Sequence, residues 1–212
     1  MQFDNLTHCE IEEQAKRLLE SYFASRNMSL SLPIPIEAIA EHYLGYDIEI
    51  SDEGVFASPL VLGGIIFDQK KIIINAVAEA HEGRYSFTLA HEVGHHVLHK
   101  AVFEASDSAR MVCREDANKP IEERQADHFA GALLMPEECI RRLYSSLRIP
   151  RRQYSGKAMK AVARRVMTAG GFSNVSNQAM IVRLHQLGLT KETIIQVVYR
   201  TMFKFIGRIT GH

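Results

Sequence analysis

The sequence of 212 residues has little of several features that would place it in a special class of protein. Its three cysteines, Cys9, Cys113 and Cys139, are too few and too irregularly spaced for a disulfide framework. No window approaches the ~18 uninterrupted apolar residues of a membrane-spanning helix, and the N-terminus lacks the basic and then apolar pattern of a secretory signal. We therefore expect a globular cytoplasmic protein, with one substantial domain or one domain and a smaller appendage.

Net charge is also lacking over the whole chain, but the two signs are separated along it. Residues 1–150 carry 14 Lys and Arg against 24 Asp and Glu, whereas residues 151–212 carry 11 against one, Glu192. A basic module of this kind is typical of proteins that bind nucleic acid, so DNA is a candidate partner of residues 151–212. The oppositely charged halves could equally attract each other and dock. Both interpretations stay open.

The most informative stretch is Thr88–His99, which reads TLAHEVGHHVLH. On a helix, His91 and His95 lie one turn, about 6 Å, apart on the same face, so two imidazoles can bind one metal ion. Glu92 can take a proton from a water bound to that ion. The apolar flanks indicate a buried helix rather than a chance match on a surface helix. Gly94 lowers helix stability, so we expect it to let another segment approach closely.

A catalytic zinc site needs a third protein ligand and one position left open for water. His96 points about 100° away from His95 around the helix, so it cannot share the ion. His99 lies about 12 Å along the axis from His91, which is too far for the same metal. We expect His99 to support the site from behind or to pack. The third ligand should therefore come from another element.

A second helix is predicted from Ile121 to Met135, and it carries the best candidates. Glu123 and Asp127 share one face at i,i+4 spacing. We assign Glu123 to the metal, with Glu122 as its strongest competitor, and expect Asp127 to accept the outer N–H of a ligand histidine. An acidic helix start favoured by the helix dipole would explain Glu122 and Glu123. It would not explain Asp127, which lies deep in the apolar stripe.

Two further roles remain open in the sequence. The group that stabilises an oxyanion is not identified, and Tyr85, His81 and His128 are candidates. Cys113 lies in the polar stretch 104–120, which reads as a long loop. Its thiolate could occupy the open zinc position and regulate the site, although a buried, small apolar residue is the simpler interpretation.

The remaining patterns predict packing elements. The Gly63-Gly64 pair could let a substrate peptide add to the edge of a strand, or it could make a simple bend. A polar turn at residues 68–70 predicts a hairpin between the last two of the strands. Helices are expected at Cys9–Arg26, Ile36–Tyr43, Arg84–Lys100, Tyr154–Thr168, Ser176–Leu187 and Lys191–Phe205, and strands at Asp47–Ile50, Val55–Ser58, Gly64–Phe67 and Lys71–Asn75.

The motif Phe87–His95, followed along the chain by the motif Glu123–Pro136, resembles the two long motifs of the ImmA/IrrE-type zinc metallopeptidases. The likeness extends over roughly residues 30–190 and is specific because of the length of both motifs. The matching stretches are Phe87–His95 with Leu98-His99, Glu123–Pro136, Ile72–Asn75, and Val175-Ser176 through Arg183-Leu184 to Leu187–Leu189.

The resemblance implies an α+β, zincin-like fold, with a small antiparallel or mixed sheet packed on the active-site helix and a helical C-terminal region. It implies zinc held by His91, His95 and Glu123, with Glu92 as the general base. It also implies a peptidase that cleaves a helix-turn-helix transcriptional repressor and so switches on stress-response or mobile-element genes.

We expect a metallopeptidase domain over residues 1–136 and a basic, helix-turn-helix-like region over residues 137–212. In the latter, Phe172–Leu189 could contain a recognition helix, although the stretch lacks the glycine that the family has just before Val175-Ser176. The alternative function is a regulatory or adaptor protein without proteolytic activity, which binds DNA or a repressor and has a structural or inactive metal site.

Overall fold

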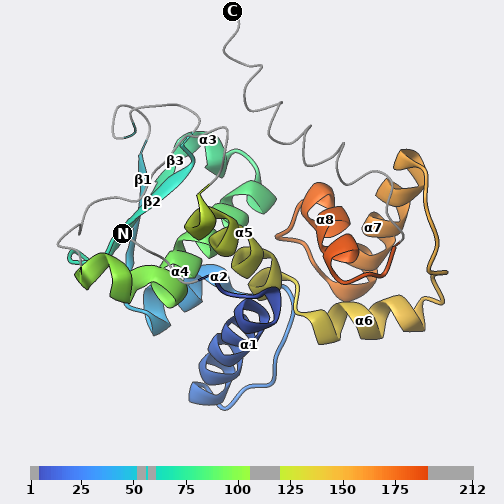
Figure 1. Cartoon of the computed structure of the whole chain (residues 1–212), viewed down its shortest axis with the longest axis horizontal. Coiled ribbons are helices and arrows are strands. Elements are labelled where there is room, and N and C mark those ends of the chain that lie inside the picture. Colours follow the sequence, from blue (N-terminus) through green and yellow to red (C-terminus); the bar gives the residue numbers. More distant parts are fainter. Residues whose placement is uncertain (1–4, 52–55, 57–60, 106–119, 191–212) are drawn as a thin grey trace, which may run out of the picture. The chain divides into compact units, whose positions relative to one another are not determined.

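The computed structural model describes residues 5–51, 56, 61–105 and 120–190, and it divides the chain into two compact units. The first unit comprises the chain up to Pro136 together with Phe172–Ser176. The second comprises Glu137–Gly171 and the residues from Asn177 onward. Each unit has its own apolar core. Figure 1 labels the helices and strands of both units.

The first unit begins with helix α1 (His8–Ser25). Thr7 and Glu10 form a capping box, in which the Thr7 side chain accepts from the Glu10 backbone N–H and Glu10 accepts from that of Thr7. The apolar residues repeat at helical spacing, so that one face of α1 is buried and packs on α5. That buried face consists of Ile11, Ala15, Leu18, Leu19, Tyr22 and Phe23.

A three-stranded mixed sheet lies beside the helices of this unit (Figure 1). Its order is β1-β3-β2, with β1 (Asp47–Ser51) parallel and β2 (Gly63–Ile66) antiparallel to the central β3 (Lys71–Asn75). The hairpin expected between the last two strands is confirmed. The strand expected at Val55–Ser58 lies, except for Phe56, outside the described residues.

Short helical segments connect these elements. The helix expected at Ile36–Tyr43 is α2 (Ile36–Ala38), continued by a π-helical turn, η1 (Ile39–Tyr43). After β3 comes α3 (Ala76–Glu79), which is too short to be predicted from a helical repeat. The Asn75 side chain caps α3 by accepting from the backbone N–H of Val77 at 3.0 Å.

The two helices that carry the metal motifs form the centre of the first unit. Helix α4 (Glu82–Ala105) packs on α5 (Ile121–Leu134) and on strands β2 and β3. A Cβ atom added at Gly94 would lie 3.2 Å from Ala126 Cα and 3.2 Å from Phe129 Cδ1. The close approach expected at Gly94 is thus confirmed, and α5 is the segment that approaches.

Residues 172–176 belong to this unit although they come late in the chain. The Asn174 side chain donates to the Ile34 carbonyl at 2.8 Å. At Gly83, an added Cβ would lie 2.6 Å from the backbone nitrogen of Ser176, so only glycine leaves room for this segment.

The second unit contains α6 (Glu137–Ser146), α7 (Gly156–Gly170) and α8 (Asn177–Gln186). Ser155 caps the start of α7, and Gly171 ends it in the left-handed conformation with φ of 71°. The helix expected at Lys191–Phe205 lies outside the described residues. Among the helices that the structure describes, none is long and apolar enough to cross a membrane. The α+β fold class expected from the sequence is confirmed.

Candidate metal centre

Helices α4 and α5 bring three ligand-type side chains to one point. His91 and His95 are one turn apart on α4, and their Nε2 atoms lie 3.1 Å from each other. From α5, Glu123 places Oε2 3.2 Å from His91 Nε2 and Oε1 3.3 Å from His95 Nε2. The candidate ligand atoms of the three residues all lie within 4.8 Å of one another. Glu122, the competing carboxylate, is half-buried and is not part of this cluster.

The electrostatics of the cluster favour a positive charge at its centre. Burial by itself lowers the pKa of His91, but hydrogen bonds with Asp127 and Glu123 and the charges of these two carboxylates outweigh it and raise the pKa to about 10. Burial opposes ionisation of Glu123, yet its hydrogen bonds with His91 and His95 lower the pKa of that carboxyl well below its usual range. The two carboxylates therefore stabilise positive charge at the centre of the cluster.

The donor set suits zinc. Two imidazole nitrogens 3.1 Å apart can share at most one proton, and once that proton leaves, both lone pairs face the space beside the Glu123 carboxylate. Two imidazoles and one carboxylate are among the protein ligand sets of catalytic Zn²⁺ sites, in which a fourth position holds water or substrate. His91, His95 and Glu123 thus fit the metal that the sequence implies.

Glu92 lies beside this cluster as a buried carboxyl group. It is 3% exposed, and its Oε2 has no hydrogen-bond partner in the described part of the chain. Burial raises the pKa of Glu92 to about 8; the charge of His91 opposes this rise and that of Glu123 adds to it. A carboxyl with such a pKa can both take and return a proton near neutral pH.

Strand β2 passes directly over Glu92. A Cβ atom added at Gly63 would lie 3.0 Å from Glu92 Oε1 and 2.6 Å from Thr88 Cγ2. The backbone of β2 can come this close only because residue 63 is glycine. One end of the sheet edge is thereby held against the carboxyl group of the motif.

The residues behind the cluster are connected by hydrogen bonds. Asp127 Oδ1 accepts from His91 Nδ1 at 3.0 Å, the contact expected of an outer-sphere carboxylate. His99 is buried, with Nδ1 3.1 Å from His95 Nδ1 and Nε2 2.9 Å from Gln125 Oε1. Sequence reasoning missed Gln125, although a glutamine in an apolar stripe was a usable signal. His96 instead contacts the hydroxyl of Tyr46 through Nδ1 at 2.9 Å.

The other candidates contact groups outside the cluster or lie outside the described chain. Tyr85 is partly buried and hydrogen-bonded to Glu37, and both effects raise the pKa of its hydroxyl. His128 stacks on His8, and its Nε2 lies 3.1 Å from Glu12 Oε1. His81 is exposed at the start of α4, and Cys113 lies outside the described residues.

Comparison with known protein families identifies the family of the chain. The model of the Peptidase_M78 family, described as the IrrE N-terminal-like domain, matches residues 33–166. This range contains β1 to β3 and both helices of the metal cluster. No curated protein matches the chain.

Proposed function

Since the chain belongs to the Peptidase_M78 family, we propose that it is a zinc-dependent endopeptidase that cleaves a partner protein. The observation that carries this proposal is the meeting of His91, His95 and Glu123 next to the buried carboxyl of Glu92. These three residues would hold the zinc ion. When bound, zinc would lower the pKa of a water ligand and polarise the carbonyl of the peptide to be cleaved.

Glu92 acts as the general base. Its Oε2, which has no hydrogen-bond partner among the described residues, takes a proton from the attacking water. The same carboxyl then returns that proton to the amine that leaves. The pKa of about 8, raised chiefly by burial, suits both steps. Asp127 keeps His91 oriented through its Nδ1 during the cycle.

The edge of β2 is the proposed binding site of the substrate backbone. In the strand order β1-β3-β2, β2 is the outer strand next to β3, and Gly63 at its start lies against Glu92. An extended peptide that adds to this edge would form main-chain hydrogen bonds with the strand. Its backbone would then pass next to the residue that moves the proton.

We further infer that the substrate is a helix-turn-helix transcriptional repressor, the substrate class that the sequence resemblance implies. The test incubates the zinc-loaded protein with a helix-turn-helix repressor from the same organism, with and without a chelator. We expect cleavage that the chelator abolishes. If the protein binds zinc but leaves both that repressor and a mixed peptide library intact, the adaptor function without proteolysis is favoured instead.

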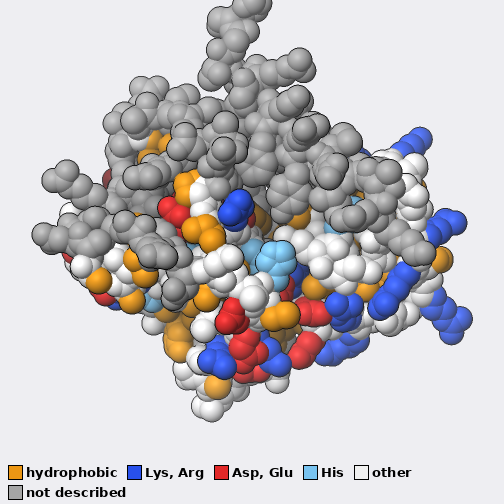
Figure 2. Space-filling model, viewed as in Figure 1, with side chains coloured by type: hydrophobic (Ala, Val, Ile, Leu, Met, Phe, Trp, Pro, Cys, Tyr) orange, Lys and Arg blue, Asp and Glu red, His pale blue; other side chains and the backbone are white. Residues whose placement is uncertain are grey.

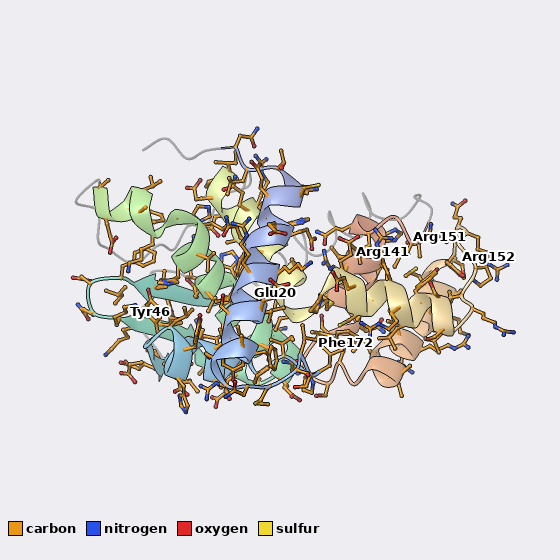
Figure 3. The ribbon with its side chains drawn as sticks, turned by 90° about the horizontal axis from the view of Figure 1, so that it is seen from below. Glu20, Tyr46, Arg141, Arg151, Arg152 and Phe172 are labelled. Carbon is orange, nitrogen blue, oxygen red and sulfur yellow. The ribbon has the colours of Figure 1, made fainter. Side chains whose placement is uncertain are left out.

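Nucleic-acid binding by the second unit is a second candidate function, supported by charge. The described residues 137–190 contain ten Lys and Arg against two acidic residues, Glu137 and Glu138. Figure 2 shows blue Lys and Arg side chains gathered over α6 and α7. Figure 3 shows Arg151 and Arg152 projecting from the loop that joins these two helices. Such a surface attracts polyanions without regard to sequence.

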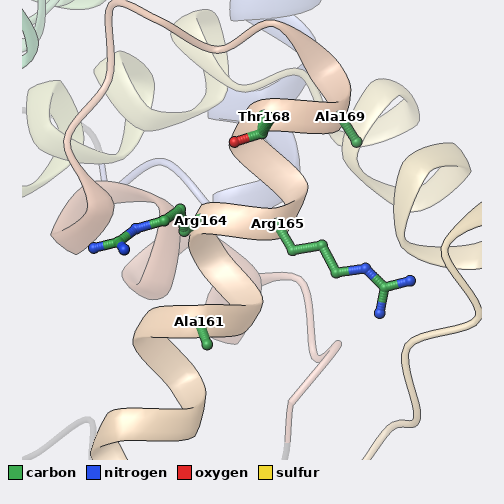
Figure 4. Close-up of a pocket in the computed structure, with 5 residues that line it drawn as sticks. All are labelled: Ala161, Arg164, Arg165, Thr168 and Ala169. Carbon is green, nitrogen blue, oxygen red and sulfur yellow. The ribbon is translucent and has the colours of Figure 1, made fainter.

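Between α7 and α8, the exposed positive charge lies on α7. The one Lys or Arg of α8, Arg183, is fully buried, so a recognition role of α8 through that residue is not supported. On α7, the exposed cations are Lys157, Lys160, Arg164 and Arg165. Figure 4 shows the two arginines extending to different sides of a shallow hollow, which the small side chains of Ala161, Thr168 and Ala169 complete. A phosphate backbone could approach closely there.

Binding of a fluorescent duplex DNA to the full chain tests this second function. We expect a Kd of roughly 10⁻⁴ to 10⁻⁶ M that weakens steeply with salt. The double variant Arg164→Gln, Arg165→Gln should lower the slope of log K against log salt by about 2. The matched control, Lys16→Gln with Arg17→Gln on α1, removes the same charge from the acidic half and should bind like wild type. Equal loss in both variants, or no binding by wild type, would rule it out.

A further inference from the structure

Three buried side chains form a hydrogen-bonded chain behind the proposed zinc site. His95 Nδ1 lies 3.1 Å from His99 Nδ1, and His99 Nε2 lies 2.9 Å from Gln125 Oε1. The exposed fraction is 4% for Gln125 and lower for both histidines. The histidines come from α4 and Gln125 comes from α5. These hydrogen bonds thus connect His95, a proposed metal ligand, to helix α5.

The direction of these hydrogen bonds follows from the outer end. An amide oxygen only accepts, so His99 Nε2 must donate to Gln125. A neutral imidazole has one N–H, which leaves His99 Nδ1 as an acceptor. His95 Nδ1 must therefore be the donor to His99, and His95 Nε2 is left with a lone pair. That atom is 3.3 Å from Glu123 Oε1.

His91 is oriented by a single direct hydrogen bond. Its Nδ1 donates to Asp127 Oδ1 at 3.0 Å, so once the ring is neutral its lone pair is on Nε2. Helix α5 therefore contacts His91 through Asp127 and His99 through Gln125, and it also carries Glu123. We propose that Gln125 is a positioning residue which, through His99, holds His95 in the tautomer that can bind zinc.

This proposal rests on the proposed zinc site and adds a consequence of its own. Without the amide oxygen, His99 can carry its proton on Nδ1 instead of Nε2. His95 would then accept at Nδ1 and carry its proton on Nε2, where the metal should bind. Zinc binding would have to move that proton first. Mutation of a residue that hydrogen-bonds to a ligand histidine typically lowers metal affinity by about 10–100-fold.

Two variants of Gln125 separate the hydrogen bond from packing. Gln125→Met keeps the length of the side chain but loses the acceptor, whereas Gln125→Glu keeps an acceptor. We expect the zinc affinity, measured by competition with a chelator, to fall about 10–100-fold for Gln125→Met and to stay within about 3-fold of wild type for Gln125→Glu. Gln178→Met in α8 is the matched control and should bind zinc like wild type.

The tautomers themselves are read by long-range ¹H–¹⁵N NMR of the histidine rings. In zinc-free wild type we expect the proton of His95 on Nδ1 and that of His99 on Nε2, and in Gln125→Met a mixture of tautomers for both. A proton on His95 Nε2 in wild type overturns the proposal, even if Gln125→Met fails to fold. Equal zinc affinity of Gln125→Met and wild type overturns it too while leaving the zinc site intact. If wild type binds no zinc, the proposed function fails first.

Discussion

Glu92 is the residue whose surroundings are most clearly chemical. Its carboxyl is buried, has an oxygen without a hydrogen-bond partner among the described residues, and has a pKa raised to about 8 chiefly by burial. A purely structural role would not explain why a buried carboxyl oxygen is left without a hydrogen bond, which lowers the stability of the fold. Burial of this kind is common at catalytic sites, where it adjusts a carboxyl to proton transfer near neutral pH.

We predict that Glu92→Gln separates binding from catalysis. The amide has the shape of the carboxyl but cannot take a proton, so peptide cleavage should fall by roughly 10²–10⁴-fold. Zinc content, measured by elemental analysis, and the circular dichroism spectrum should stay those of wild type. Full cleavage activity in this variant would remove the general-base assignment.

Adjacent carboxylates on α5 provide a second test at the scale of the residue. Glu123 is buried against both histidines, whereas Glu122 is half-buried and outside the cluster. Glu123→Gln should therefore lose most of its zinc affinity, and Glu122→Gln should keep it. Titration of each variant with zinc against a competing chelator decides between them. Loss of zinc from the Glu122 variant alone would reverse the ligand assignment.

At the scale of the element, the site depends on how closely α5 approaches α4. The contact at Gly94 leaves 3.2 Å between an added Cβ and Ala126 Cα, which is tighter than ordinary packing. The neighbour is helix backbone, which cannot turn away as a side chain can. The distance between the histidines of α4 and Glu123 of α5 is thus set in part by the missing side chain of one glycine.

We predict that Gly94→Ala weakens both the fold and the site. Alanine favours the helix by about 1 kcal/mol, but overpacking against α5 costs about 1–3 kcal/mol, so the net free energy of unfolding should fall by about 1 kcal/mol. Because α5 carries Glu123, zinc affinity should fall as well. Chemical denaturation and zinc titration measure the two effects.

Gly156→Ala is the control for that experiment. Gly156 begins α7, and an added Cβ there meets no atom within 4 Å. This variant should be as stable as wild type or slightly more stable, with unchanged zinc affinity. If Gly94→Ala behaves in the same way, the close approach of the two helices does not matter for the site.

At the scale of the whole molecule, the chain consists of two compact units with opposite chemical character. The metal cluster lies entirely in the first unit, and ten of the 12 charged residues among the described residues 137–190 are cations. We propose that residues 1–136 and 137–212 act as the peptidase domain and the basic helical region. The inclusion of Phe172–Ser176 in the first unit means that the chain returns to it once.

Zinc removal should therefore act on one unit. A ligand that binds only the folded state stabilises it by about 2.7 kcal/mol at a concentration 100 times its Kd. We predict that a chelator lowers the melting temperature of the first unit and leaves the melting temperature of the second unit unchanged. Tyrosine and amide signals in NMR measure the unfolding of each unit. A melting curve that the chelator does not alter would speak against a bound metal.

Much of the fold could be predicted from local sequence patterns. The helical repeats of apolar residues predicted α1, α5, α7 and α8 to within a few residues, and the polar turn predicted the hairpin of β2 and β3. Helix α4 continues to Ala105, beyond the expected end at Lys100 and into the stretch expected to be a loop. The family expected from two long motifs was also confirmed by the family model that matches residues 33–166. Helices α3 and α6 were missed: α3 is too short to show a helical repeat, and α6 buries only Ile140 and Tyr144.

The sequence by itself determined which groups share one face of a helix. A helix places residues four apart one above the other, and the Nε2 atoms of His91 and His95 indeed lie 3.1 Å apart. Only the tertiary structure decided what meets that face: Glu123 rather than Glu122, Gln125 behind His99, and the backbone of Gly63 against Glu92. The period of a helix fixes directions around its own axis, whereas the position of a second element depends on the packing of a whole core.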